Sequence, residues 1–297
     1  MKNFALIGVG GYIAPRHMQA IKDTGNKLVA AMDVHDSVGV MDNYFPEAEF
    51  DTSLDLFERR LRNIKDLGTN LDYFTVCTPN YLHDAHVRFG LKMGAHVICE
   101  KPIVLDPWDV DALETAERET GKNIYTILQL RLHPAAIALK EKIDAAPPGQ
   151  RFRVDLRYIA ARGNWYHASW KGDEQKSGGI ATNIGVHFFD LLLWLFGDVK
   201  GSRIITETRL ALTGELELEK ADINWLLSID AKNLSEAVRN KGLRNQRELR
   251  INEELIDFSE GFTRLHVKSY EEILTGGGIR VADTRKVIGL VRGMRKK

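Results

Sequence analysis

The sequence has few cysteines, no excess of either charge and no long apolar run, and each deficit excludes a class of protein. Its two cysteines, Cys77 and Cys99, lie in apolar stretches, which is typical of small core residues in a reduced protein and not of a disulfide framework. The 41 basic and 41 acidic residues cancel, so we expect neither nucleic acid nor a membrane surface as partner. Because no stretch reads as a membrane span or signal peptide, we expect a cytoplasmic protein.

The first part of the chain alternates short apolar runs with segments of helical spacing. This alternation predicts a parallel sheet covered by helices on both faces, as in a Rossmann dinucleotide-binding domain. The expected strands are Phe4–Gly8, Lys27–Asp33, Leu71–Cys77, His96–Glu100 and Asn123–Gln129. The expected helices are Pro15–Thr24, Leu54–Ile64, His83–Met93 and Pro107–Thr120.

The pattern changes after Pro147-Pro148-Gly149, where strands follow one another in series. This order predicts an α+β domain with an open, mostly antiparallel sheet. We therefore expect an α/β protein with an NAD-binding domain at residues 1–129 and a substrate-binding and oligomerisation domain at 130–297. The expected elements are strands at Arg151–Arg162, Ser202–Thr213, Glu215–Lys220, Asn224–Asp230, Glu248–Asn252 and Glu254–Phe258, and helices at Thr182–Phe196, Phe262–Leu274 and Val281–Arg292.

The first strand runs into a glycine-rich turn. Gly8 permits a tight turn, and Gly10 lets the backbone approach a pyrophosphate at the start of the next helix. The following strand ends on Asp33, where a carboxylate accepts ribose hydroxyls and repels a 2′-phosphate. The pattern predicts NAD over NADP, and a turn that serves only packing is the alternative. The cofactor-binding residues expected here are Gly8, Gly10, Gly11, Tyr12, Ile13 and Asp33.

Two later strands end on polar residues followed by proline. One leads into Thr78-Pro79-Asn80 and the other into Glu100-Lys101-Pro102. Because ligands bind at the carboxyl ends of parallel strands, we expect Lys101 in the crevice where cofactor meets substrate. The alternatives are that Lys101 is a solvated cation and that Asn80 only caps the helix containing His83. The cofactor-binding residues expected in these segments are Thr78, Asn80, His83, Glu100, Lys101 and Gln129.

A glycine pair in the second half precedes a helix that carries polar residues on one stripe. Asn183 and His187 are four residues apart, and Asp190 follows on the same stripe, where it could orient the imidazole. A histidine near neutral pKa suits a general base that takes a hydroxyl proton. The alternative is a core histidine satisfied by Asp190.

Cationic and aromatic residues gather in an expected loop upstream of this helix. Arg162 and Lys171 suit an anionic ligand, either a carboxylate or a phosphate, and a packing loop is the alternative. We expect no metal site. The substrate-binding residues expected across the chain are Lys101, Arg131, Arg162, Asn164, Trp165, Tyr166, Lys171, Asn183 and His187.

Taken in order, the glycine turn, Thr78-Pro79-Asn80, Glu100-Lys101-Pro102 and the glycine pair leading to His187 resemble the Gfo/Idh/MocA oxidoreductase family. The resemblance covers nearly the whole chain. It implies hydride transfer between a sugar or cyclitol carbon and the nicotinamide, with Lys101 and His187 in the catalytic positions. It also implies a cis peptide before Pro102 and a second sheet that forms subunit contacts, hence a homotetramer or homodimer.

Two departures from the common family pattern point to one branch. Asn183 stands where many members have aspartate, and the turn after Gly10 is about one residue longer. The strings Gly11–His17, Arg162–Tyr166, Ser169–Asp173 and Ala181–Phe188 resemble NAD-dependent dehydrogenases that oxidise the C3 hydroxyl of UDP-N-acetylglucosaminuronate for O-antigen and related lipopolysaccharide. That branch implies an anionic UDP-sugar substrate and, in some members, reoxidation of NADH by 2-oxoglutarate.

Two other functions stay open at this point. One is the same chemistry on another polyol, such as inositol or glucose. The other is a catalytically silent NAD-binding sensor, which has no need of Lys101 or His187. Of the two catalytic candidates we favour His187 as the base, because a lysine must first have its pKa depressed.

Overall fold

The structure is a computed structural model that describes residues 1–256, 258 and 262–295. The chain forms two compact units. The first contains Met1–Ile127 and His266–Arg285, and the second contains Leu128–Leu265 and Lys286–Lys297. The single boundary expected after residue 129 therefore misses a segment near the end of the chain that returns to the first unit.

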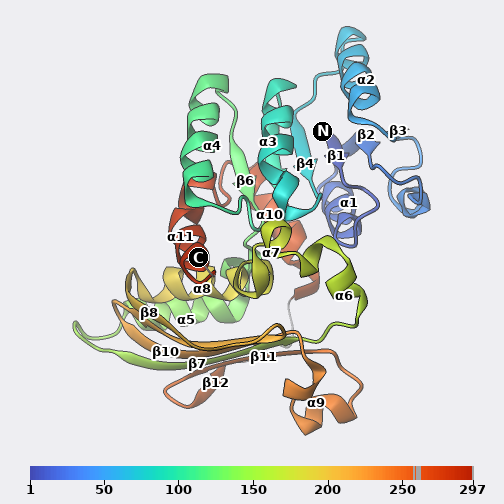
Figure 1. Cartoon of the computed structure of the whole chain (residues 1–297). Helices are drawn as coiled ribbons and strands as arrows, with labels where there is room; N and C mark the ends of the chain where they lie inside the picture. Colours follow the sequence, from blue (N-terminus) through green and yellow to red (C-terminus); the bar gives the residue numbers. More distant parts are fainter. Residues whose placement is uncertain (257, 259–261, 296–297) are drawn as a thin grey trace. The chain divides into compact units, whose positions relative to one another are not determined.

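The first unit is built on a six-stranded, wholly parallel sheet (Figure 1). Its strand order, β3-β2-β1-β4-β5-β6, is that of a Rossmann fold. The central strands are buried on both faces because helices cover the sheet on each side. The strands are β1 Asn3–Ile7, β2 Lys27–Met32, β3 Glu49–Asp51, β4 Tyr73–Val76, β5 His96–Cys99 and β6 Ile124–Thr126.

Helices between these strands begin and end where local sequence favours it. Pro107 opens α4, and Gly121 ends it in the left-handed conformation. The returning segment contributes Tyr270 and Ile273 to the core that also contains Phe4 and Met18. The helices of this unit are α1 Ala14–Asp23, α2 Leu54–Asp66, α3 His83–Lys92, α4 Pro107–Thr120 and, almost entirely, α10 Leu265–Leu274.

The second unit is built on a mixed sheet in the order β12-β11-β7-β10-β9-β8. Only β7 and β10 pair in parallel, and the other neighbours are antiparallel. Burial alternates along β9 and β10, which is the pattern of a sheet with one covered face. The strands are β7 Phe152–Ala160, β8 Val199–Glu207, β9 Ala211–Leu218, β10 Ala221–Ser228, β11 Asn245–Ile251 and β12 Glu254–Ile256.

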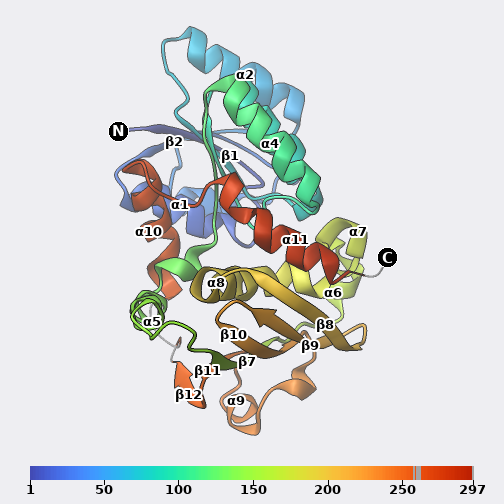
Figure 2. The same ribbon diagram turned by 90° about the vertical axis from the view of Figure 1, so that its left-hand side faces the viewer.

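Helices α5 and α8 lie against one face of this sheet (Figure 2). A helical run at Glu174–Phe196 is, contrary to expectation, long and apolar enough to cross a membrane, but 78% of its apolar stretch is buried in the protein. Its hydropathy is therefore that of a core helix. The helices are α5 Pro134–Asp144, α6 Trp165–Ala168, α7 Glu174–Ser177, α8 Val186–Phe196, α9 Glu236–Asn240 and α11 Arg285–Gly293.

Several expected elements differ in the structure. The strand expected at Ser202–Thr213 is broken, because Thr208 accepts backbone hydrogen bonds from Leu210 and Ala211 and turns the chain between β8 and β9. The last parallel strand is shorter than expected, and Gln129 lies in a 3₁₀ turn after it. The loop expected around Trp165 contains the short helix α6. Helix α5 was not predicted.

Candidate active site

The glycine turn after β1 is closely packed, and only glycine fits its first position. Gly8 has a φ of +87°, and a Cβ there would lie 2.7 Å from the backbone carbon of Cys77. A Cβ on Gly10 would lie 3.2 Å from the Asp33 carboxylate, and one on Gly11 would lie 3.1 Å from the carbonyl oxygen of Gly8. Because these positions have no room for a side chain, the backbone of the turn stays open to the close approach of a phosphate at the start of α1.

Asp33 follows β2 and is tied to this turn. Its Oδ2 accepts the backbone N–H of Gly10 at 3.0 Å, and its Oδ1 accepts that of His35 at 3.0 Å. The carboxylate is therefore fixed beside the turn. Of the other turn residues, Ile13 precedes α1 as its N-cap, and Tyr12 is 89% exposed.

The segment after β4 is arranged by two histidines of α3. Thr78 Oγ1 is 2.9 Å from Nδ1 of His86. His83 is buried, with Nδ1 2.7 Å from the carbonyl oxygen of Pro102 and Nε2 2.8 Å from that of Thr78. His83 thus lies between the backbones of Thr78 and Pro102, and because burial lowers its pKa the neutral ring donates to one of these two oxygens at a time. Both of these contacts join this predicted cofactor residue to the protein backbone. Asn80 does not cap α3, because Leu82 occupies that position.

The segment after β5 carries Glu100 and Lys101. The peptide between Lys101 and Pro102 is cis, as the family resemblance implies. Lys101 is half-buried, and its backbone N–H donates to Oε2 of Glu100 at 3.2 Å. Thr78, Glu100 and Lys101 all follow the carboxyl ends of adjacent strands, so the structure brings these predicted residues to one edge of the sheet.

In the second unit, Arg131 and Asp190 form a bidentate ion pair. Nε of Arg131 donates to Oδ2 of Asp190 at 2.8 Å, and Nη2 donates to Oδ1. The Asp190 side chain is 1% exposed and that of Arg131 is 19% exposed. Arg131 was expected to bind substrate, and the structure shows that its guanidinium also binds Asp190, the residue expected to orient His187.

The stripe around His187 is also organised locally. A π-helical turn at Ala181–Gly185 precedes α8, so the regular helix expected from Thr182 begins later. Nδ2 of Asn183 donates to the hydroxyl of Tyr166 at 2.8 Å, which brings two predicted substrate residues together. Burial raises the pKa of Tyr166. His187 stands in the first turn of α8 and is half-buried.

Lys171 lies over two tryptophan rings in the same region. Its Nζ is 4.9 Å from the ring centre of Trp170 and 5.4 Å from that of Trp165, which is 55% exposed. Burial, followed by the nearby Arg162 cation, lowers the pKa of Lys171. The remaining residue of the predicted set in this segment, Asn164, is exposed.

A cavity of about 290 Å³ in the second unit joins predicted residues to others that the sequence did not reveal. Tyr166 and Lys171 line it together with Arg209 and Arg295. Arg209 follows β8 and Arg295 follows α11, so three cations from distant segments meet at one hollow, with Glu174 and Glu207 also on its wall. No spacing in the sequence connects these positions.

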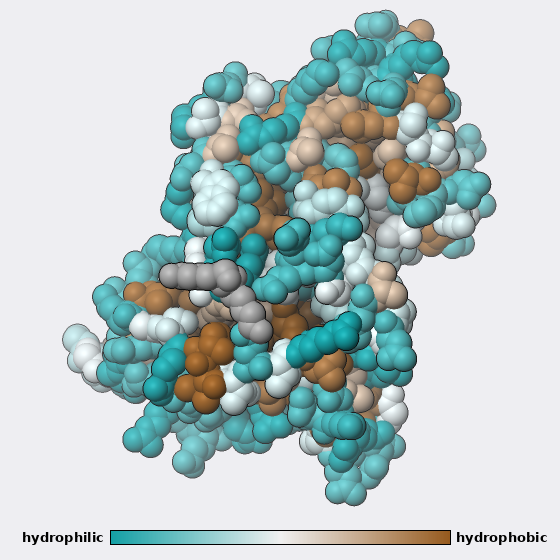
Figure 3. Space-filling model, viewed as in Figure 1, coloured by the Kyte–Doolittle hydropathy of each residue, from teal (hydrophilic) through white to brown (hydrophobic). Residues whose placement is uncertain are grey.

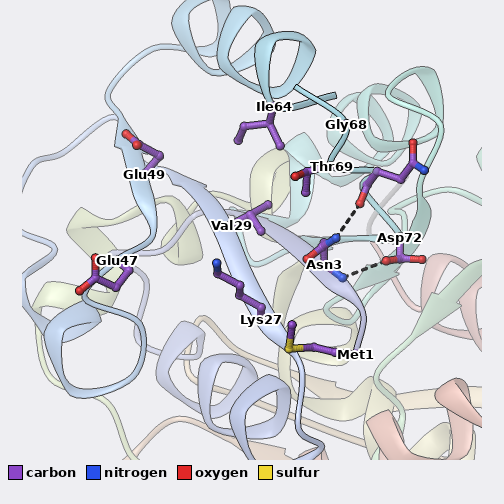
Figure 4. Close-up of a pocket in the computed structure, with 11 residues that line it drawn as sticks. Met1, Asn3, Lys27, Val29, Glu47, Glu49, Ile64, Gly68, Thr69 and Asp72 are labelled. Carbon is purple, nitrogen blue, oxygen red and sulfur yellow. Dashed lines mark hydrogen bonds between the residues drawn. The ribbon is translucent and has the colours of Figure 1, made fainter. Parts of the chain in front are cut away.

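A larger cavity, of about 600 Å³, lies at the opposite strand ends of the first unit (Figure 4). Asn3 and Asp72 line it and are joined by a hydrogen bond of 2.9 Å. These residues precede or open their strands, whereas ligands of parallel sheets bind where strands end. We therefore place the cofactor at the glycine turn and not in this cavity.

A parallel sheet with a glycine turn and a fixed acid defines a Rossmann nucleotide-binding domain, here joined to an α+β unit. The sequence comparison agrees: the NAD-binding Rossmann fold of an oxidoreductase family matches residues 2–127, and the C-terminal alpha/beta domain of the same family matches residues 140–207. The chain belongs to the Gfo/Idh/MocA oxidoreductase family.

Solved structures resemble the chain over its full length. The WlbA (WbpB) dehydrogenase from Thermus thermophilus in complex with NAD and alpha-ketoglutarate is 44% identical, with a TM-score of 0.94 and coverage of 100% of this chain and 96% of that one. The same dehydrogenase in complex with NAD and UDP-GlcNAcA is 43% identical, with a TM-score of 0.95 and coverage of 100% and 95%.

Curated relatives match over shorter segments. The D-glucoside 3-dehydrogenase of Escherichia coli is 26% identical over 44% of this chain, and the match spans 37% of that protein. The putative UDP-kanosamine synthase oxidoreductase subunit of Amycolatopsis mediterranei is 31% identical over 46% of this chain, and the match spans 38% of that protein. These matches do not reach across the whole of either relative.

The residues present fit NAD. A Cβ at Gly8 would overlap the backbone, so the turn keeps the close approach that a pyrophosphate needs, and Asp33 stands where an adenosine ribose is held.

Proposed function

We propose that the protein oxidises the C3 hydroxyl of UDP-N-acetyl-D-glucosaminuronate to the 3-keto sugar with NAD. The observation that carries the proposal is the full-length likeness, at 43% identity, to a dehydrogenase solved with NAD and UDP-GlcNAcA. Partial matches to dehydrogenases of other sugars support the same reaction class. The proposal selects one substrate within that class.

We assign the chemical step to Lys101 and His187. The step removes a proton from the C3 hydroxyl and a hydride from C3, and bound NAD supplies the hydride acceptor. His187 takes the hydroxyl proton, because a histidine accepts a proton near neutral pH without a large pKa shift. Lys101 polarises the same hydroxyl through its ammonium. Its backbone is fixed by the hydrogen bond to Glu100.

An anionic substrate fits the cations of the second unit. A uronate carboxylate and a diphosphate both favour arginine and lysine partners, and Lys171, Arg209 and Arg295 line one cavity there. Because burial and Arg162 lower the pKa of Lys171, an anion beside it would stabilise its charged form. Inositol and glucose carry no negative charge that these three cations could bind.

We extend the proposal to the reoxidation of NADH and to the biological role of the enzyme. We propose that 2-oxoglutarate reoxidises NADH on the enzyme, as the crystallised complex of the relative with alpha-ketoglutarate suggests. We further propose a homotetrameric or homodimeric, cytoplasmic enzyme that supplies sugars for O-antigen and related surface polysaccharides.

An anaerobic absorbance experiment tests the reaction. We expect UDP-N-acetylglucosaminuronate to raise the absorbance at about 340 nm as NADH forms, and 2-oxoglutarate to reverse that rise. UDP-N-acetylglucosamine, which lacks the carboxylate, is the matched control, with inositol and glucose beside it. Activity on inositol or glucose alone would overturn the assigned substrate. If none of these compounds reduced NAD, the result would favour the silent sensor.

A further inference from the structure

A buried polar cluster lies directly behind Lys101 in the first unit. It consists of Thr75 in β4, Glu100 after β5, His17 in α1, and His266 and Tyr270 in α10. Each is at most 7% exposed. Two of its members, His266 and Tyr270, come from the segment that returns from the end of the chain to the Rossmann unit.

The Glu100 carboxylate is the centre of this cluster. Its Oε1 lies 2.9 Å from Nε2 of His17 and 3.2 Å from Nε2 of His266. Its Oε2 accepts the backbone N–H of Lys101 at 3.2 Å. Both carboxylate oxygens are therefore held from within the protein, and one of them is bonded to the residue to which we assign catalysis.

The hydrogen-bond pattern fixes the proton positions. Burial opposes the Glu100 anion, but the hydrogen bonds from His17 and His266 outweigh it and hold the pKa of Glu100 well below its usual range. Burial lowers the pKa of His17, which favours the neutral ring. A neutral His17 that donates from Nε2 must accept at Nδ1, and the Tyr270 hydroxyl, 2.8 Å away, can donate there.

Tyr270 in turn is satisfied by Thr75. The two hydroxyl oxygens are 3.1 Å apart, so Thr75 donates to Tyr270, Tyr270 to His17, and His17 to Glu100. The order fixes one tautomer of His17. If the Tyr270 hydroxyl were absent, Nδ1 of His17 would lose its donor and would be a buried acceptor without this partner, which weakens the hold of the chain on the carboxylate.

The backbone on the other side of Lys101 is also held. The carbonyl oxygen of Pro102 is 2.7 Å from Nδ1 of buried His83. Hydrogen bonds thus fix the main chain immediately before and after the lysine. A displacement of about 1 Å at a reacting group costs on the order of 100-fold in rate, so support of this kind has a direct kinetic consequence.

We propose that His17, His266 and Tyr270 are positioning residues that hold Lys101 through the Glu100 carboxylate. The inference rests on the proposed catalytic role of Lys101. It also assigns Glu100, expected from the sequence to bind the cofactor, a role inside the protein. No part of the sequence motif predicts that a histidine 166 residues away along the chain completes this arrangement.

The same three groups invite a second interpretation. His17, Glu100 and His266 each offer one ligand atom, and these atoms lie within 4.8 Å of one another, as in a metal site. The hydrogen bonds described above use the same atoms without an ion. Metal analysis of the purified enzyme is therefore part of the test.

The experiment compares His266→Leu with His266→Gln, whose amide N–H can replace that of Nε2, and adds Tyr270→Phe. We expect His266→Leu to lower kcat by about 10- to 100-fold with the KM and Kd for NAD unchanged, His266→Gln to recover most of it, and Tyr270→Phe to fall between. The matched control is His96→Leu. His96 lies at the start of β5, the strand that leads to Glu100, and this variant should keep normal kcat.

Acetylation of Lys101, followed by peptide mass spectrometry, reads the position of the lysine without turnover. We expect faster labelling in His266→Leu and wild-type labelling in His266→Gln. The inference is overturned if His266→Leu leaves both kcat and labelling unchanged, or if His266→Gln does not recover them. A loss of NAD affinity together with kcat, or stoichiometric metal in the wild type, also overturns it. An inactive wild type whose Lys101 labelling still follows these variants refutes only the proposed reaction.

Discussion

Arg131 binds both carboxylate oxygens of Asp190, although the two residues are 59 positions apart in the sequence. The pair joins the turn after β6 to the middle of α8. Its two members differ in burial, since the aspartate is almost fully covered and the arginine is not. That difference determines how the fold responds to the loss of either partner.

We expect Arg131→Met to destabilise the protein by about 3–5 kcal/mol, because it leaves a buried carboxylate without its counter-charge. Asp190→Asn should cost less, about 1–3 kcal/mol, because the guanidinium keeps some contact with water. Arg131→Lys, which retains the charge but not the bidentate geometry, should lie between them. Urea unfolding measures all three, and equal losses for the first two would contradict the argument.

The glycine turn gives a second prediction. Gly8 and Gly25 both have positive φ, but only Gly8 has backbone atoms where a Cβ would stand. We expect Gly25→Ala to cost about 1 kcal/mol, from the backbone conformation alone. Gly8→Ala should cost clearly more and should also weaken NAD binding, because the turn must shift. Unfolding curves and NAD titrations of the two variants, taken together, check this contrast.

The fold could be predicted from the sequence where local patterns dominate. Apolar strands, a glycine turn, and polar residues at strand ends place Gly8, Thr78 and Lys101 at one edge of a parallel sheet, because the alternation of strands and helices makes all strands run in one direction. The break between β8 and β9 escaped prediction, because the four polar residues at 206–209 suit an exposed strand as well as they suit a turn.

The supporting contacts of the site could not be predicted. His17, His266 and Tyr270 meet only because α10 returns to the Rossmann unit, and a single sequence carries no sign of which distant segments will pack together. The cavity lined by Arg209 and Arg295 is hidden for the same reason. Local spacing identifies side chains that can do chemistry, whereas tertiary packing decides what holds them.

Asp33 sets the expected cofactor preference. Its carboxylate is fixed by the backbone N–H groups of Gly10 and His35, so it cannot turn away from a 2′-phosphate without breaking both bonds. We expect a lower Kd for NAD than for NADP in the wild type. In Asp33→Asn the two Kd values should lie closer together. Tighter binding of NADP by the wild type would show that this residue has been assigned wrongly.

Lys101 and His187 are expected to act in the chemical step and not in holding the cofactor. Lys101→Met and His187→Asn should each reduce kcat by about 10²- to 10⁴-fold, the range for loss of a general acid or base. The Kd for NAD, measured by fluorescence titration, should stay near the wild-type value. Near-normal turnover in both variants would remove the mechanism.

The acid stability of the protein should depend on His86. Burial, followed by the neighbouring His83, lowers the pKa of His86 from an ordinary value of 6.5 to about 4. Between these values the unfolded chain binds a proton that the folded protein does not, so the free energy of unfolding falls as the pH falls from 6.5 to 4. His86→Asn removes the titrating ring, and its amide can still bond the Thr78 hydroxyl.

Urea unfolding at several pH values across this window measures the effect. The wild type should lose stability more steeply toward low pH than His86→Asn. The variant should keep part of the slope, because burial also lowers the pKa of His17 and of His83. Identical slopes would mean that His86 is protonated equally in the folded and unfolded chains, which contradicts its burial beside Thr78.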